Sequence, residues 1–507
     1  MIIAEQVHDV LIVGSGAGGG TLAGELVARG RSVLLLERGR SLPLDEQNLA
    51  GISLFRTPRY HPPEPWFGPD GDPFAPQMLY ALGGNTKIWG GVLQRPREAE
   101  FSGVRLQEGT SPDWGLRYAD FEPFLERAEQ LYRVHGAAGV DPTEPPRHGG
   151  YGHAPRPIEP FLEAIGEGLE RQGLHPFRLP LSWTSSSADP SGDAERFGVD
   201  RASADAPAAG FRLVDGARVL ALHVNPAGSE VQGVEAELEG ERWLFRGRQV
   251  VLAAGAINTP AILLASATAS HPAGLANGSG QVGRNLMKLQ LSALLQRASE
   301  PNSGRYGRSL GVNDYLWGDR NVDYGLGSIQ SAGGVLQDPL FAESPPLLSL
   351  VSRLLPDAAL EWLADRSVSW WAMSSVLPDP DNRVSLEKGR IRIDYLANCR
   401  EGHDRLVYRW LDTIQKLERD PLTSVVTRAP IYPRGEAPLA VMGYACGTCR
   451  MGADPSTSVV DLECRAHGLA NLWIADASVL PSCPAVGLGL TVIANALRIA
   501  ARLSAAL

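Results

Sequence analysis

The sequence predicts an α/β protein that contains a Rossmann-type nucleotide-binding domain and a second large domain. The chain has 507 residues, and since single hydrophobic cores stop growing at roughly 250–300 residues, a chain of this length is expected to form two large domains. Residues 8–40 read as strand, glycine turn, helix and strand, which is how a Rossmann-type domain begins. Hydrophobic residues make up 44% of the chain and charged residues 21%, as in soluble globular proteins.

The net charge and the distribution of apolar residues argue against nucleic acid and membranes as partners. The net charge of -10 argues against nucleic acid or an anionic membrane surface as a partner. The first eight residues lack the cationic and apolar parts of a secretory signal. The most apolar window, residues 250–269, contains Asn258, Thr259 and Pro260, so it predicts strand, turn and helix, and no membrane span is expected.

The cysteines favour a reducing compartment. Their number, five, is odd, and a chain of this size needs no disulfide framework, so we expect a cytoplasmic protein. Cys446 and Cys449 form a C-x-x-C, but a redox pair is the less favoured interpretation because no thioredoxin-like sequence surrounds it. A zinc site would need a second cluster of ligands, and the sequence has none, so no metal is expected.

A glycine-rich turn follows the first strand and predicts a dinucleotide site. Its sequence is GSGAGG, from Gly14 to Gly19. Gly14 permits the tight turn, Gly16 lets the backbone approach a pyrophosphate, and Gly19 lets the next helix pack closely on the strand. The N-terminus of that helix stabilises phosphate charge.

The residues after this turn support the same prediction. Ala23 and Leu26 lie where the helix faces the sheet, Gly30 ends it, and residues 33–36 form the second strand. Glu37 follows that strand and can accept both ribose hydroxyls of an adenosine, which disfavours NADP. NAD and FAD both remain compatible with this motif.

The rest of the chain reads as a mixture of helices, strands and loops. Residues 41–80 predict an extended excursion, and residues 118–134 a helix. Residues 183–210, rich in small polar residues, predict a mobile loop, which could also be a plain disordered insertion. Residues 391–395 predict a strand, and a long Ala-rich helix is expected from about Leu490.

Several further segments together resemble the glucose–methanol–choline (GMC) oxidoreductase family. They follow the family's order over nearly the whole chain and decide in favour of FAD. The segments are LGGNTKIWGG at 82–91, VLAAGAINTP at 251–260, LPDPDNRV at 377–384, GTCRMG at 447–452 and NLWIADAS at 471–478.

The resemblance implies the family's two-domain α+β architecture. A discontinuous FAD domain would comprise residues 1–150, 213–290 and 439–507. The substrate domain, built on an antiparallel sheet, would comprise residues 151–212 and 291–438.

The resemblance also implies which residues bind FAD. Some family members attach FAD through a histidine in the second glycine-rich loop, and Ile88 stands at that position, so non-covalent FAD is expected. Thr491 would start the final helix, whose N–H groups would stabilise the reduced flavin. The implied FAD-binding residues are Gly14, Ser15, Gly16, Ala17, Gly19, Glu37, Arg38, Gly83, Gly84, Asn85, Thr86, Gly90, Gly91, Val219, Ala254, Gly255, Asp476, Ala477, Leu488 and Thr491.

The chain departs from the family at the catalytic pair. The family usually places a base, a histidine, three residues before the Gly-Thr of the C-terminal block, and here that residue is Tyr444. The position of its usual asparagine partner falls on Gly487. A phenol is mostly protonated at neutral pH, so Tyr444 could orient a substrate more readily than it could act as a base. Cys446 and Cys483, near the predicted flavin, could serve as acid, base or nucleophile, although buried packing is the favoured interpretation of both.

Three functional hypotheses remain open. The leading one is an FAD-dependent oxidoreductase that transfers hydride from a C–H bond of a small specialised metabolite (an alcohol, an amine or an activated C–H) to flavin N5. Its electron acceptor would be oxygen, a quinone or another carrier. The alternatives are a redox-neutral FAD enzyme (elimination, rearrangement or photochemical step) and a flavin-binding protein without turnover. Trp317, Trp370 and Trp371 would suit a ring-containing or apolar ligand, with core packing as the other interpretation.

Overall fold

The computed structural model describes residues 1–42, 61–87, 89–182, 210–301, 308–333, 362, 365–430 and 432–507. Two predictions fall largely outside this part of the chain: the mobile loop at 183–210, of which only Gly210 is described, and Ile88 as the position of a covalent attachment.

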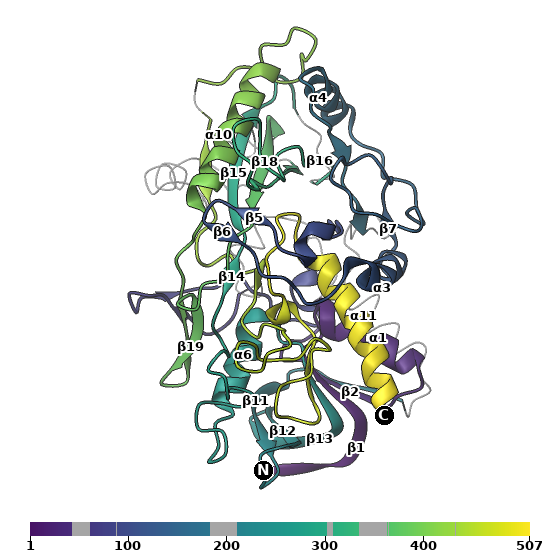
Figure 1. Cartoon of the computed structure of the whole chain (residues 1–507), viewed down its shortest axis with the longest axis vertical. Helices are drawn as coiled ribbons and strands as arrows, with labels where there is room; N and C mark the ends of the chain where they lie inside the picture. Colours follow the sequence, from purple (N-terminus) through teal and green to yellow (C-terminus); the bar gives the residue numbers. More distant parts are fainter. Residues whose placement is uncertain are drawn as a thin grey trace.

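A seven-stranded sheet forms the half of the protein that contains the first glycine turn, at the lower end of the molecule in Figure 1. Its strand order is β10-β2-β1-β13-β12-β11, and β23 also pairs with β13. Strands β10, β2, β1, β13 and β23 are parallel, whereas β12 and β11 add antiparallel neighbours. The strands are β1 (Ile2–Val13), β2 (Val33–Leu36), β10 (Phe211–Val214), β11 (Arg218–Val224), β12 (Val231–Leu238), β13 (Glu241–Leu252) and β23 (Leu472–Ile474).

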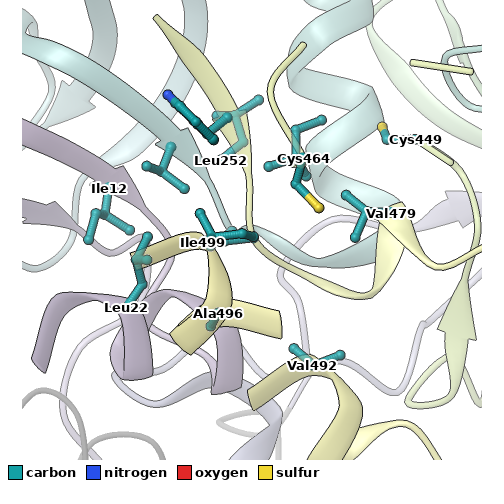
Figure 2. Close-up of a cluster of buried hydrophobic side chains, with 14 of the residues drawn as sticks. Ile12, Leu22, Leu252, Cys449, Cys464, Val479, Val492, Ala496 and Ile499 are labelled. Carbon is teal, nitrogen blue, oxygen red and sulfur yellow. The ribbon is translucent and has the colours of Figure 1, made fainter. Parts of the chain in front are cut away.

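Helices cover this sheet because its central strands are apolar on both faces. Figure 2 shows Ile12 of β1 and Leu252 of β13 packed with Leu22 of α1 and with Ala496 and Ile499 of α11. Helix α11 contacts both α1 and α3, and the three helices lie close together in Figure 1. The helices on this half are α1 (Ala17–Ala28), α3 (Tyr118–Leu131), α6 (Gly255–Ala265) and α11 (Gly489–Ala506).

The predicted helix at 118–134 ends three residues early, as α3. Arg133 has a φ of 47°, in the left-handed region, so the helix cannot continue through it. Val134 instead begins the short strand β7. The final helix and the strand expected at 391–395 are confirmed within a residue, as α11 and β20 (Arg390–Asp394).

A six-stranded antiparallel sheet forms the other half, with the order β21-β15-β18-β17-β16-β8. Trp370 of β18 packs against Trp410 of α10, with ring centroids 4.9 Å apart. Because strand side chains alternate, the next residue, Trp371, faces the opposite side of the sheet. The elements are β8 (Phe177–Arg178), β15 (Gln290–Arg297), β16 (Leu310–Val312), β17 (Ser328–Gly333), β18 (Ser367–Ser374), β21 (Arg434–Glu436), α4 (Pro160–Arg171) and α10 (Arg400–Leu417).

Short strands and 3₁₀ helices connect the two halves. A four-stranded sheet has the order β19-β20-β3-β4, and three strand pairs complete the described topology. Within the described ranges, no helix has the length and apolar character needed to cross a membrane. The remaining elements are β3 (Trp66–Phe67), β4 (Pro73–Phe74), β5 (Arg105–Leu106), β6 (Gly109–Thr110), β7 (Val134–His135), β9 (Leu181–Ser182), β14 (Met287–Lys288), β19 (Arg383–Glu387), β22 (Ala445–Cys446), η3 (Gly84–Lys87), η4 (Glu98–Phe101) and η6 (Ala477–Val479).

Helix α1 packs so closely on the chain after β23 that Gly18 tolerates no side chain. A Cβ atom added to Gly18 would lie 1.7 Å from the Ala475 carbonyl oxygen. We expect Gly18→Ala to reduce the free energy of unfolding of the apoprotein by about 2–3 kcal/mol, because backbone on both sides must shift. Urea denaturation measures this change. Gly16→Ala is the matched control, since an added Cβ there meets nothing within 4 Å; equal stability of the two variants would contradict the packing argument.

Candidate active site

A cavity of about 900 Å³ lies between the two large sheets. Its wall is built from segments far apart in the sequence. They are the glycine turn after β1, the loop at 84–92, the end of β13 with the start of α6, strands β17 and β18, the chain before β22, and the chain around the start of α11.

The first glycine turn forms one end of this cavity. Gly14 has a φ of 99°, and a Cβ there would lie 2.5 Å from the Ala253 carbonyl oxygen, so the position requires glycine. Gly16 instead borders open space. Among the described residues, no side chain caps α1 at Gly16. The first N–H groups of this helix can therefore bind a ligand, and the helix dipole favours an anion there.

The buried carboxylate of Glu37 organises this end. It accepts hydrogen bonds from the Ser15 N–H at 2.9 Å, the Ser15 hydroxyl at 2.6 Å and the Gly39 N–H at 2.8 Å. Burial raises the pKa of Glu37, while these hydrogen bonds oppose that shift. Glu37 also lines the cavity, so a ligand hydroxyl can reach its carboxylate.

The second glycine loop closes over the first. The Gly83 N–H donates to the Ser15 hydroxyl oxygen at 2.9 Å. A Cβ on Gly84 would lie 3.4 Å from the Cα of Gly16, so the backbones of the two loops are near contact. The Asn85 side chain accepts from the Leu79 N–H at 2.9 Å, which fixes the loop from its outer side.

Asp476 joins the C-terminal segments to the same wall. Its carboxylate accepts from the Ser478 N–H at 2.8 Å, the Gly255 N–H at 2.9 Å and the Thr259 hydroxyl at 2.6 Å. These bonds hold η6 against the start of α6. Burial raises the pKa of Asp476, and the bonded donors act in the opposite direction.

The structure brings most of the predicted cofactor residues to this cavity. All but three of them line it, Arg38, Ala254, Ala477 and Val219 among them. Gly19 and Gly83 belong to the two loops but lie behind the wall, and Thr491 is fully buried in the first turn of α11. Helix α11 begins at Gly489, and Leu488 before it lines the cavity.

Tyr444 and Gly487, two of the predicted catalytic residues, also line the cavity. Arg308 donates a hydrogen bond from Nη1 to the Tyr444 hydroxyl oxygen at 3.0 Å. The Arg308 guanidinium also lies over the Trp371 ring, 3.9 Å from its centroid. Gly487 has a φ of 103° and open space beside its Cα, so the wall carries no side chain at this position.

The structure does not bring Cys446 and Cys483 to the cavity. Both side chains are buried behind its wall. The Cys446 sulfur lies 3.7 Å from the Ser482 carbonyl oxygen, and the Cys483 sulfur 3.8 Å from the Tyr444 carbonyl oxygen. Burial raises the pKa of the Cys483 thiol well above its usual value. This placement favours packing over a chemical role for both thiols.

Sequence reasoning missed Arg308 and Gln330, which line the cavity beside Trp371. No motif surrounds either residue; the only signal in this region is the strand pattern that contains Trp370 and Trp371. Of the three tryptophans considered as ligand contacts, only Trp371 lines the cavity. Trp370 is part of the core against α10, and Trp317 is 41% exposed at the surface.

A buried acid, Glu100, lies in η4 next to the C-terminal segment. The Ser482 hydroxyl donates to it at 3.1 Å and accepts from the Trp114 indole N–H at 2.9 Å. Burial raises the pKa of Glu100 to about 7, although Ser482 and the charge of Arg97 lower it.

Comparisons with known proteins agree with this architecture. Two family models described as GMC oxidoreductase match residues 184–290 and 380–496. The 6'''-hydroxyparomomycin C oxidase of Streptomyces lividus is 30% identical, and the alignment covers 98% of this chain and 91% of that protein. The chain belongs to the GMC oxidoreductase family.

Two further similarities support the assignment. The paromamine 6'-oxidase of Streptomyces fradiae is 28% identical to this GMC oxidoreductase, over 97% of this chain and 91% of that protein. The crystal structure of pyridoxine 4-oxidase from Mesorbium loti superposes with a TM-score of 0.68 at 20% identity, and the match covers 98% of this chain and 99% of that one. At this identity the structural likeness shows the shared fold.

As a member of this family, the protein is an FAD-dependent oxidoreductase, and the cavity fits FAD. The open space beside Gly16 and the uncapped α1 could hold the pyrophosphate, and Glu37 could accept from a ribose hydroxyl. The start of α11 could lie against the flavin, where helix N–H groups favour negative charge.

The open space beside Gly16 yields a test of FAD binding. Gly16 has a φ of -63°, which alanine adopts without strain. We expect Gly16→Ala to weaken FAD binding by about tenfold or more, because its methyl group occupies space that a backbone-bound pyrophosphate needs. Titration of the apoprotein with FAD, followed by flavin fluorescence, measures the change. An unchanged dissociation constant would rule out a pyrophosphate at Gly16.

Glu100 yields a test of pH dependence. The unfolded chain releases this proton near pH 4.5, whereas the folded protein holds it to about pH 7. The folded state binds more protons in this window, so the contribution of Glu100 to stability falls as pH rises from about 4.5 to 7. Glu100→Gln removes the ionisation, and we expect it to exceed wild type in unfolding free energy by up to about 3 kcal/mol at pH 8. Urea denaturation at pH 5 and pH 8 checks this; a difference that does not grow with pH would contradict it.

Proposed function

We propose that this GMC oxidoreductase oxidises an alcohol carbon of a hydroxylated small molecule, with Tyr444 in the position that the family usually gives to a histidine. The observation that carries the proposal is the Tyr444–Arg308 pair on the cavity wall. Bound FAD would supply the hydride acceptor.

The hydrogen bond from Arg308 determines what Tyr444 can do. The guanidinium occupies one lone pair of the Tyr444 hydroxyl oxygen, so the O–H group and the other lone pair are available to a substrate hydroxyl. Tyr444 can therefore orient that hydroxyl. The positive charge of Arg308 stabilises the negative charge that develops on the substrate oxygen as its O–H proton leaves; loss of hydride from the adjacent carbon then removes that charge.

The surrounding wall supports the same role. Trp371 and Met373 add apolar surface next to Tyr444, which excludes water from the reacting hydroxyl. In the described part of the wall, the only histidine is His61, on the segment that leads to β3. The name of the relative from Streptomyces lividus describes an oxidase of a hydroxylated compound, which supports an alcohol as the group oxidised.

The decisive experiment is anaerobic stopped-flow reduction of the flavin by a panel of alcohols, amines and polyols. We expect alcohols to bleach the flavin and Tyr444→Phe to slow bleaching by about 10²-fold, because a reacting hydroxyl that is no longer oriented can lose that much rate. FAD content should be unchanged.

Tyr408→Phe provides the matched control, because it removes a phenol that is 59% exposed on α10 and outside the cavity wall. Equal rates in Tyr444→Phe and wild type would remove Tyr444 from the chemistry. A fully loaded enzyme that no member of the panel bleaches would favour a redox-neutral reaction instead.

A further inference from the structure

An unpaired amide is buried on the substrate side of the cavity. Gln330 of β17 is 1% exposed, and neither its side-chain nitrogen nor its oxygen has a hydrogen-bond partner among the described residues. It lies directly opposite Trp371 of β18, and both side chains line the cavity. Leaving a buried amide unpaired costs about 1–3 kcal/mol, and a ligand in the cavity that both donates and accepts hydrogen bonds would satisfy these two atoms.

A positively charged residue, Arg308, lines the same part of the cavity wall as Gln330 and Trp371. The Arg308 side chain is held between the Trp371 ring and the backbone of Gly90, where an added Cβ would lie 2.5 Å from the arginine Cδ. One of its nitrogens, Nη1, donates to Tyr444. Among the described residues Arg308 has no carboxylate partner, so its remaining N–H groups can bind a ligand.

The carboxylates of the wall are already engaged. Those in the described part are Glu37, Glu64 and Asp476. Glu64 pairs with Arg38 at 2.7 Å, and the other two accept the backbone and hydroxyl hydrogen bonds given above. A cationic substrate would therefore meet Arg308 without a free carboxylate to balance it, which is unfavourable.

We infer that the substrate is a polyhydroxylated carboxylate: Arg308 binds its carboxylate, and Gln330 binds a hydroxyl. The inference rests on the proposed function only for the position of the oxidised carbon. Because Arg308 and Tyr444 are in contact, a carboxylate on one and a hydroxyl on the other belong to carbons at most a few bonds apart. The reacting alcohol is then close to the acid, as in a 2-hydroxy or 3-hydroxy acid.

Three probes with the same six-carbon chain test this inference, because they differ only at C1. They are gluconate (carboxylate), glucitol (hydroxymethyl) and glucamine (ammonium-methyl). Their dissociation constants for the FAD-loaded enzyme are measured anaerobically by calorimetry, and flavin absorbance in the same samples reports reduction separately. Binding preference and turnover are thus independent readouts, so failure of the proposed function and failure of this inference can be told apart.

We expect gluconate to bind about tenfold or more tightly than glucitol, since a charge-assisted arginine–carboxylate pair is roughly twice as strong as a neutral hydrogen bond, and glucamine to bind most weakly. Arg308→Gln should bring gluconate to about the affinity of glucitol, and Arg308→Lys should keep part of the preference. Gln330→Ala should weaken gluconate and glucitol alike.

Arg434→Gln is the matched control, because it removes the same charge from β21 of the same sheet, outside the cavity wall. It should leave the order of affinities unchanged. Equal affinities for gluconate and glucamine, an absence of saturable gluconate binding, or an unchanged gluconate preference in Arg308→Gln would each overturn the inference.

Discussion

The hydrogen bonds that converge on the buried Glu37 carboxylate hold the nucleotide end of the cavity in shape. Ser15 donates from both its backbone and its hydroxyl, and Gly39 donates from the other side. Since the Ser15 hydroxyl also accepts from Gly83, the end of β2, the turn after β1 and the second glycine loop form one connected unit. An unpaired buried carboxylate would be strongly destabilising, so the fold and the ligand site share the same polar groups.

Asp476 holds the C-terminal segments against the same wall in a similar way, through hydrogen bonds to a buried carboxylate. It is buried, its two oxygens accept three donors, and these donors belong to η6 and to the beginning of α6. The nucleotide end of the wall thus depends on two buried acidic residues. The hydrogen bonds that they accept offset the cost of burying their charge. The substrate end differs in kind, because two of the residues that line it are a cation, Arg308, and an unpaired buried amide, Gln330.

The sequence predicts the nucleotide end well because its chemistry is local. The turn from Gly14 to Gly19, the strand that ends at Glu37 and the loop at 82–91 each carry a spacing that only a few backbone conformations satisfy. The FAD assignment follows from the family resemblance, and family membership is confirmed by the comparisons.

The substrate end could not be predicted in the same way. Gln330 meets Trp371 only through the register of two strands about forty residues apart, and Arg308 reaches Tyr444 across more than a hundred residues. Such contacts arise from tertiary packing and leave no local periodicity or motif.

The close contact between Arg308 and Gly90 links the two halves of the molecule. Gly90 belongs to the cofactor loop, whereas Arg308 comes from the chain just before β16 of the substrate sheet. A methyl group on Gly90 would occupy the place of the arginine side chain, so the two positions cannot vary independently. Anyone who redesigns the pocket for a different ligand by shortening residue 308 would open a gap directly beside the cofactor loop, and filling that gap from position 90 is the compensating change the geometry offers.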